Sequence, residues 1–154
     1  MLDEVDLEIL RILQGDCRVT VKEVARRLGK PVTTVYSRLK KLEGEGYVKG
    51  YKAILDAGRL GYSTTAFVFV SFSYEAAGRR LDQREVARVI ASFPEVQEVH
   101  IVTGDWDMLL KVRVRGVEEL GRFIVDKLRR VEGVVKTLTS VSLDCVKEDT
   151  SIPI

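Results

Sequence analysis

The chain has 154 residues, a formal net charge of +2 at pH 7, 45% hydrophobic residues and 31% charged residues. This length accommodates one domain or two small ones, and the hydrophobic share is sufficient for a packed core. No run approaches the ~18 consecutive apolar residues of a membrane-spanning helix, which excludes a helical membrane protein.

The first residues, MLDEVD, are acidic and lack the basic start of a signal peptide. The two cysteines, Cys17 and Cys145, are far apart and show no clustered metal-ligand spacing. We therefore expect a reduced cytoplasmic protein without a metal or another cofactor. The chain has no Asn and only three Gln, which together with its many charges is typical of hyperthermophile proteins.

A first helix is predicted for residues 3–14. Asp3 is placed to cap its N-terminus, and the acids of the first turn suit the positive end of the helix dipole. Its apolar face comprises Val5, Ile9, Ile12 and Leu13. We expect this face to pack across the next two helices and to complete a three-helix unit.

Residues 18–51 have the pattern of two short helices around a tight turn. Thr20 precedes the first of them and Glu23 follows, the capping-box spacing in which each side chain accepts from a free backbone N–H. Gly29 ends that helix, because a residue without Cβ can turn left-handed without steric cost. The next helix is predicted for residues 33–43, with a buried stripe of Val35, Leu39 and Leu42. This arrangement indicates a helix-turn-helix, whose second helix can enter the major groove of DNA.

Basic charge is concentrated in this segment. Residues 18–52 carry ten Lys and Arg against three Glu, a charge of +7, whereas residues 1–16 carry one Arg against five acids, a charge of −4. A local basic surface attracts the phosphate backbone even when the net charge is small. The charge distribution therefore supports binding to double-stranded DNA.

On the second helix of the motif, the side opposite the apolar stripe is polar and basic. Hydroxyl groups there can bind base edges or phosphates. Arg38 lies nearer the buried edge and has two open roles, an ion pair with an acid of the first helix, such as Asp6 or Glu8, or a phosphate contact. The predicted DNA-binding residues are Thr20, Lys22, Thr33, Thr34, Tyr36, Ser37, Arg38, Lys40 and Lys41.

Two short extended runs in residues 47–55, broken by Gly50, predict a β wing or the start of a connecting strand. The following residues, 56–65, are rich in Gly and polar side chains, which is typical of a linker. We expect a DNA-binding domain at 1–55, the linker at 56–65, a second domain at 66–147 and a tail at 148–154.

The second half of the chain repeats a strand–helix–strand pattern. Strands are predicted at 66–72, 96–102, 108–114 and 134–146, and helices at 82–93 and 117–131. The order βαββαβ predicts an α+β fold, a ferredoxin-like domain with an antiparallel sheet and both helices on one face. The other face carries apolar residues, whose exposure costs about 25 cal/mol per Å². We therefore expect it to pack against a second copy of the chain.

The segment VTGDWD, residues 102–107, joins the two repeats. Gly-Asp between strands is typical of a hairpin turn with a bulge. The free N–H groups of such a turn can also bind a carboxylate, and an acid can bind an ammonium group. Catalysis is not supported, because no base, nucleophile or metal ligand is near and the only histidine, His100, lies on a predicted strand. We do not expect an enzyme.

Three segments, LDEVDLEILRILQGDCRVTVKEVARRLG, TTVYSRLKKLEGEGYVKGYKAILD and TGDWD, together resemble the Lrp/AsnC (feast/famine) family of transcriptional regulators. The resemblance implies a winged helix-turn-helix domain and a C-terminal domain that dimerises through its sheets. It further implies tetramers or octamers, with an amino-acid effector bound between dimers. The implied effector-binding residues are Thr103, Gly104, Asp105, Trp106, Asp107, Thr137, Thr139 and Ser140.

Two positions depart from the family pattern. Pro31 stands where the family often has Ser, and proline cannot cap a helix by its side chain. The start of the second helix, and hence whether Thr33 or Thr34 faces the groove, stays open. Trp106 replaces the more usual Tyr and is expected to narrow the effector pocket.

The leading hypothesis is a sequence-specific DNA-binding transcriptional regulator, dimeric or larger, modulated by a small effector such as an amino acid. The alternative is an architectural DNA-binding protein that binds no effector. In that case residues 103–107 are only a turn.

Overall fold

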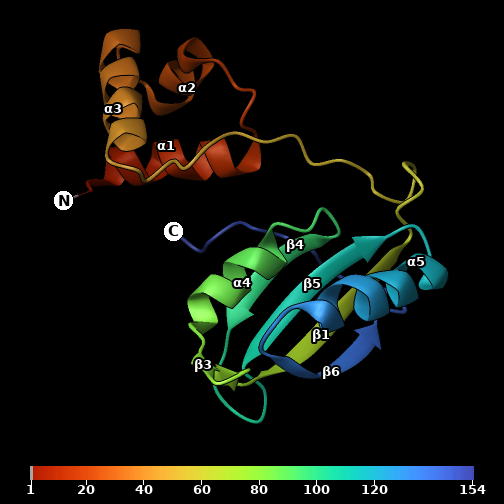
Figure 1. Ribbon diagram of the computed structural model, residues 1–154. Coiled ribbons are helices and arrows are strands. Elements are labelled where there is room, and N and C mark those ends of the chain that lie inside the picture. Colours follow the sequence, from red (N-terminus) through yellow and green to blue (C-terminus); the bar gives the residue numbers. More distant parts are fainter. Residues whose placement is uncertain (1) are drawn as a thin grey trace. The chain divides into compact units, whose positions relative to one another are not determined.

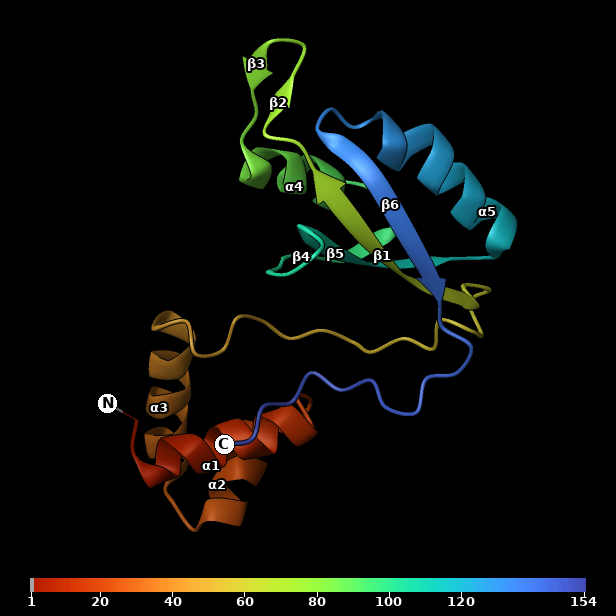
Figure 2. The ribbon, with the colours of Figure 1, turned by 90° about the horizontal axis from the view of Figure 1, so that it is seen from below.

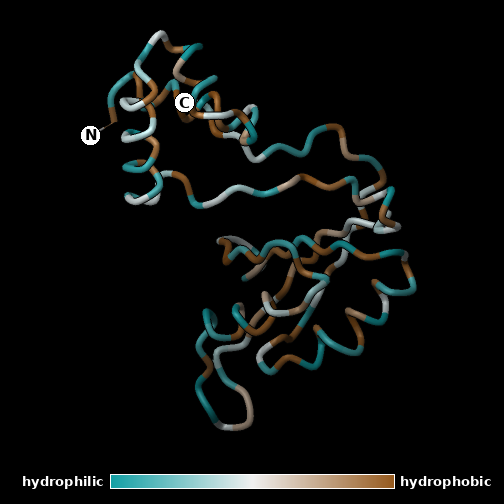
Figure 3. The backbone as a smooth tube through the Cα atoms, turned by 90° about the horizontal axis from the view of Figure 1, so that it is seen from above, coloured by the Kyte–Doolittle hydropathy of each residue, from teal (hydrophilic) through white to brown (hydrophobic). Residues whose placement is uncertain are grey.

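The computed structural model describes residues 2–154, which divide into two units. The first comprises residues 2–54 together with Lys147–Ile154, and the second comprises Leu55–Val146. Each unit has its own hydrophobic core. Figure 3 shows hydrophobic and hydrophilic stretches alternating along the chain in both units. Within the described residues, none of the helices combines the length and apolar character needed to cross a bilayer.

The first unit contains three helices, α1 (Glu4–Gly15), α2 (Val21–Leu28) and α3 (Val32–Gly44) (Figure 1). Their apolar stripes meet in one core, as the spacing of apolar residues predicts. The fully buried members of this core are Ile9, Val24, Ala25, Val35 and Leu42. The predicted three-helix unit is therefore confirmed.

The ends of these helices follow local capping chemistry. Asp6 N donates to Asp3 Oδ1 at 3.0 Å, and Asp3 N donates to Asp6 Oδ2 at 3.1 Å, a reciprocal capping box. Glu23 N donates to Thr20 Oγ1 at 3.2 Å, which confirms Thr20 as the cap of α2. Gly29 ends α2 with φ of +60°, as predicted.

One expectation for the first unit, the capping-box role of Glu23, is wrong. The carboxylate of Glu23 does not return a bond to the cap, because Arg26 and Arg27 both bind it. Residues 45–63, all of them described, form no strand, so the two extended runs expected at 47–55 are not paired with each other as a hairpin. The N–H groups of Tyr47 and Val48 donate to Leu42 O instead, at 3.0 and 3.3 Å, which folds the chain back on the end of α3.

The second unit contains the strands β1 (Thr64–Phe72), β4 (Val96–Ile101), β5 (Met108–Val114) and β6 (Val134–Val141). Its helices are α4 (Gln83–Ala91) and α5 (Val117–Arg122), the latter continuing as a π-helical segment η1 (Phe123–Lys127) and a 3₁₀ segment η2 (Leu128–Arg130). Between β1 and α4 the chain forms a small hairpin, β2 (Glu75–Ala76) and β3 (Arg79–Arg80).

The four long strands form one antiparallel sheet in the order β4-β5-β1-β6. Figures 1 and 2 show α4 and α5 on the same face of this sheet. The predicted βαββαβ, ferredoxin-like architecture is thus confirmed. The last strand is shorter than the predicted 134–146. It is an edge strand, and its only neighbour, β1, begins at Thr64, so no partner remains beyond the bond from Ser142 N to Thr65 O.

The two faces of the sheet differ in composition. The helix-covered face buries Val68, Val70, Leu110 and Val112 completely. Since side chains alternate along a strand, the neighbours of these residues point to the other face, here called the open face. Its apolar centre, as the register pairs it, is Phe67, Phe69, Leu109 and Leu138. The imidazole of His100 and the charged side chains of Glu98, Lys111, Arg113 and Lys136 occupy the same face.

Candidate functional site

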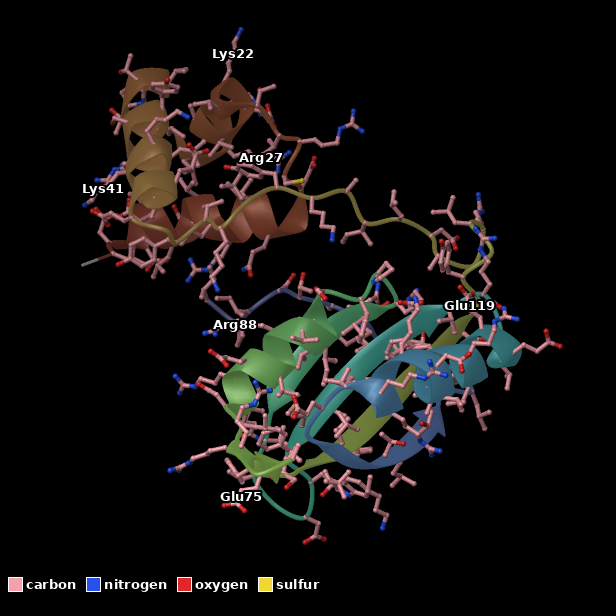
Figure 4. The ribbon with its side chains drawn as sticks, in the orientation of Figure 1. Lys22, Arg27, Lys41, Glu75, Arg88 and Glu119 are labelled. Carbon is pink, nitrogen blue, oxygen red and sulfur yellow. The ribbon has the colours of Figure 1, made fainter. Side chains whose placement is uncertain are left out.

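The polar side of α3 is exposed as the helical periodicity predicts. Thr33, Tyr36, Ser37, Lys40 and Lys41 are exposed and Thr34 is half-buried, opposite the buried Val35 and Leu42. Thr20 and Lys22, at the start of α2, are exposed as well. Figure 4 shows the side chains of Lys22 and Lys41 extending away from their helices. The exposed sides of α2 and α3 therefore present hydroxyl and ammonium groups of the kind that bind phosphates and base edges.

The lysines of α3 are paired with acids at the end of the same helix. Lys40 Nζ lies 2.8 Å from Glu43 Oε2 and 5.9 Å from the ring centre of Tyr36, and Lys41 Nζ lies 3.9 Å from Glu45. Hydrogen bonds from Lys40 and Tyr51 lower the pKa of Glu43. Burial, together with the bond to Glu43, raises the pKa of Tyr51 to about 12. Such exposed pairs are weak, so a phosphate can replace the carboxylate.

A second group of cations is held on α2. Arg26 Nη2 lies 2.6 Å and Arg27 Nε 2.9 Å from Glu23 Oε1. The hydrogen bonds from Arg26 and then Arg27 lower the pKa of Glu23 to about 2. By contrast, Lys22 and Lys30 have no ion pair within residues 2–154. They are free to meet an anionic partner.

The hydroxyl of Ser37 is already hydrogen-bonded within the chain. Its hydroxyl donates to Thr34 O at 2.9 Å, within α3. The oxygen keeps its acceptor capacity, because the proton is used by the helix backbone. Ser37 is therefore suited to accept from a base amino group rather than to donate to a phosphate.

Arg38 bridges two helices. Its Nη1 lies 2.6 Å from Asp3 Oδ2 and 2.8 Å from Asp6 Oδ1, and Asp6 is only 4% exposed. The hydrogen bond from Arg38 lowers the pKa of Asp3, and the bonds to Asp3 and Asp6 raise the pKa of Arg38. Of the two roles left open by the sequence, the structure shows the ion pair, with Asp6 rather than Glu8. Arg38 joins the start of α1 to the middle of α3.

Val32 is a surface residue that the sequence did not single out. Because α3 begins at Val32, one residue before the predicted start, this side chain stands in the first turn beside Thr33 with 47% exposure. Pro31 occupies the N-cap and makes no side-chain hydrogen bond, as its chemistry requires. An exposed methyl pair at this place suits contact with a thymine methyl group.

The loop between β4 and β5 carries the predicted effector residues Thr103, Gly104 and Asp105 on an exposed turn. Gly104 has φ of +111°, a value that favours glycine. Trp106 is half-buried, with its ring centre 6.0 Å from that of Phe69 and 5.5 Å from Lys136 Nζ. These contacts place Trp106 with residues of the open face.

Asp107 supports the end of β1. Its Oδ2 accepts from Phe72 N at 2.7 Å, and its backbone N–H donates to Val70 O at 3.0 Å. The register of β1 against β6 shifts between Ser71 and Phe72, so this carboxylate satisfies an N–H beside the irregularity. Within the described residues, Asp105 makes no ion pair and its carboxylate is exposed. Of the two acids in this loop, Asp105 is the more exposed.

The chain does not bring all the predicted effector residues together. Thr137 and Thr139 pair with Val70 and Val68, which places them on the helix-covered face, and Arg129 Nε donates to the Thr137 hydroxyl at 3.2 Å. Ser140 pairs with Phe67 and lies on the open face, as Trp106 does. The two sets of side chains therefore lie on opposite faces of the sheet.

The part of the chain that the structure describes contains no group of three or more His, Cys, Asp or Glu side chains able to hold a metal ion. Cys17 and Cys145 are free and exposed.

Replacing Arg38 by Ala is expected to lower the melting temperature of the first unit by about 5 °C, because it leaves the buried Asp6 without its cation. Lys41→Ala, on the same helix but exposed, should change it little. Because Arg38 lowers the pKa of Asp3, the ion pair stabilises the folded protein at pH values above 3.8, the ordinary pKa of this carboxyl group. The stabilisation is lost as the pH falls through the lowered pKa. Melting curves at several pH values test this. An unchanged melting temperature would contradict the positioning role.

Comparison with known proteins agrees with this geometry. Residues 2–49 match the model of a winged helix-turn-helix DNA-binding domain, and residues 65–152 match that of the Lrp/AsnC ligand-binding domain. An HTH-type transcriptional regulator of Pyrococcus abyssi is 42% identical over 149 residues, 97% of either chain. The HTH-type transcriptional regulator FL11 of Pyrococcus horikoshii is 39% identical over 153 residues, 99% of this chain and 97% of that one.

Solved structures show the same fold. A transcriptional regulator from Neisseria meningitidis, in complex with L-Met, superposes with a TM-score of 0.91 at 31% identity, covering 99% of this chain and 97% of that one. AsnC of E. coli superposes with a TM-score of 0.88 at 24% identity, covering 99% of both chains. The matches span both units, so the chain belongs to the Lrp/AsnC family of helix-turn-helix transcriptional regulators.

Proposed function

We propose that this regulator binds a defined DNA sequence as an oligomer and that an amino acid modulates this binding. The observation that carries the proposal is the exposed hydroxyl and lysine surface of α3, on a chain that also folds a ligand-binding domain with an open sheet face. In this proposal α3 lies in the major groove, where Val32, Thr33 and Ser37 contact base edges and Lys40 and Lys41 contact phosphates.

The open face supports self-association. Phe67 and Leu138, at its centre, are 38% and 49% exposed in a single chain. Packing two such faces together removes this apolar surface from water, and charges around it can pair across the interface. A two-fold dimer presents two copies of α3, which suits a DNA site with two half-sites spaced by one helical turn or a multiple.

The exposed loop at 103–105 supports effector binding. Its backbone N–H groups can bind a carboxylate, and the Asp105 carboxylate can bind an ammonium group, which together match the two charges of an amino acid. The related regulator from Neisseria meningitidis was solved in complex with L-Met. Since Thr137 and Thr139 lie on the other face of the sheet, the proposed pocket draws on two copies of the chain.

Replacing Lys40 and Lys41 by Ala should weaken binding to all DNA sequences. The slope of log affinity against log salt should fall by about 1 for each lost phosphate contact. Arg84→Ala with Arg88→Ala, two exposed cations of α4, serves as a control with the same loss of charge. Fluorescence titrations of labelled duplex at several salt concentrations measure both quantities. An equal effect of the control pair would show that only total charge matters.

Leu138→Glu should dissociate the dimer, because it places a charge at the apolar centre of the open face. Val117→Glu is the matched control, since Val117 is 68% exposed but belongs to α5 on the opposite side of the sheet. Sedimentation velocity of both variants gives the oligomeric state. Dimers that persist in the Leu138→Glu variant would exclude the open face as the interface.

L-Methionine should raise the melting temperature, because a ligand specific to the folded state stabilises it. Asp105→Asn removes a charged partner of the ammonium group. About tenfold more L-methionine should then be needed for the same rise in melting temperature. Trp106, the chain's only tryptophan, provides a second readout by fluorescence. If a panel of all amino acids changes neither signal, modulation by an amino acid is contradicted and the alternative of an architectural DNA-binding protein is favoured.

A further inference from the structure

The chain crosses between its two units twice. It leaves the first unit after Ile54, and its last eight residues, Lys147–Ile154, again belong to that unit. The residues just before them belong to the second unit and follow directly from β6. The last strand of the ligand-binding domain therefore continues into a segment that packs with the DNA-binding helices.

This tail is held by side chains of α1. Gln14 Nε2 donates to Ile152 O at 3.1 Å, and Ile152 N donates to Gln14 Oε1 at 2.7 Å. The amide of Gln14 thus pairs with one backbone unit as a neighbouring strand would. Arg11 Nε donates to Ile154 O at 2.7 Å, and the same guanidinium lies 2.7 Å from Glu4.

A turn within the tail directs the chain toward α1. Ser151 N donates to Asp149 Oδ1 at 2.9 Å, a turn that sets the direction of the chain just before Ile152. This bond lowers the pKa of Asp149 and keeps its carboxylate ionised. All four bonds are between exposed groups, and Ile152 is 63% exposed, so water can replace each of them. The contact is specific in geometry and easily released.

We propose that residues 147–154 form a releasable tether that docks the chain following β6 onto α1. The opposite side of α1 packs into the helix-turn-helix core through Ile9, and its first turn holds Arg38 of α3. The tail therefore connects the chain that follows β6 to the proposed recognition helix by way of α1, in addition to the chain connection at residues 45–63. This role rests on the proposed function only in that α3 is taken as the DNA-reading element.

The tether is tested by Gln14→Ala, alone and with Arg11→Ala, in the full chain. Gln97→Ala is the matched control, because Gln97 is an exposed glutamine of β4 in the other unit. Hydrogen exchange in residues 147–154 should become faster by about tenfold in the Gln14 variant, while α1, α2 and α3 keep their protection. Equal exchange in the unchanged protein and the variant would show that the tail is not docked.

A second measurement asks whether docking restricts the DNA-binding unit. Cys17 is exposed in that unit, so a dye attached to it in a Cys145→Ser background reports the unit's rotation. Time-resolved anisotropy should show a fast component that grows in the Gln14 variant and not in the Gln97 control. A released tail with unchanged anisotropy would overturn the tether.

Both measurements use the protein without DNA. Their results do not depend on whether the chain binds DNA. Likewise, a tail that is not docked would leave the result of the DNA titrations unchanged. With a bound duplex, the same variant should tolerate a wider range of half-site spacings than the unchanged protein, because its recognition helices are less restrained.

Discussion

A four-stranded sheet has two faces, and this chain provides helices for only one of them. Since α4 and α5 lie on the same side, Phe67, Phe69, Leu109 and Leu138 are left on a face that neither helix covers. Exposed apolar surface of this kind favours association. The proposed dimer, the spacing of its recognition helices and a pocket shared between copies all follow from this one constraint.

The DNA-binding unit separates positioning from contact. Arg38, paired with the buried Asp6, fixes α3 against α1, whereas Lys40 and Lys41 hold their charges on exposed and replaceable partners. A buried pair resists exchange with an incoming phosphate, while an exposed pair yields to it. Cations of one helix thus have two roles. The cation paired with a buried acid positions the helix, and the cations paired with exposed acids are available to bind DNA.

Helix caps and other local hydrogen bonds could be predicted from the sequence where both partners lie within a few residues of each other. The caps Asp3 and Thr20 and the left-handed Gly29 depend on bonds spanning a single turn, and the apolar periods of 3.6 and 2 identify the helices and strands. Predictions failed where a nearby competitor intervened. Glu23 matched a capping box, but two arginines one turn away bind its carboxylate more strongly than a neutral backbone N–H does.

The amino-acid sequence by itself determined the order of elements, the family and the place of the basic charge, because these depend on spacing and composition along the chain. Only the tertiary structure decided that Arg38 pairs with Asp6, 32 residues away, and that Asp107 supports Phe72, 35 residues away. It also decided that Thr137 and Thr139 lie on the face opposite Trp106. The physical reason is register, because a shift of one residue between paired strands exchanges the two faces and no local pattern records it.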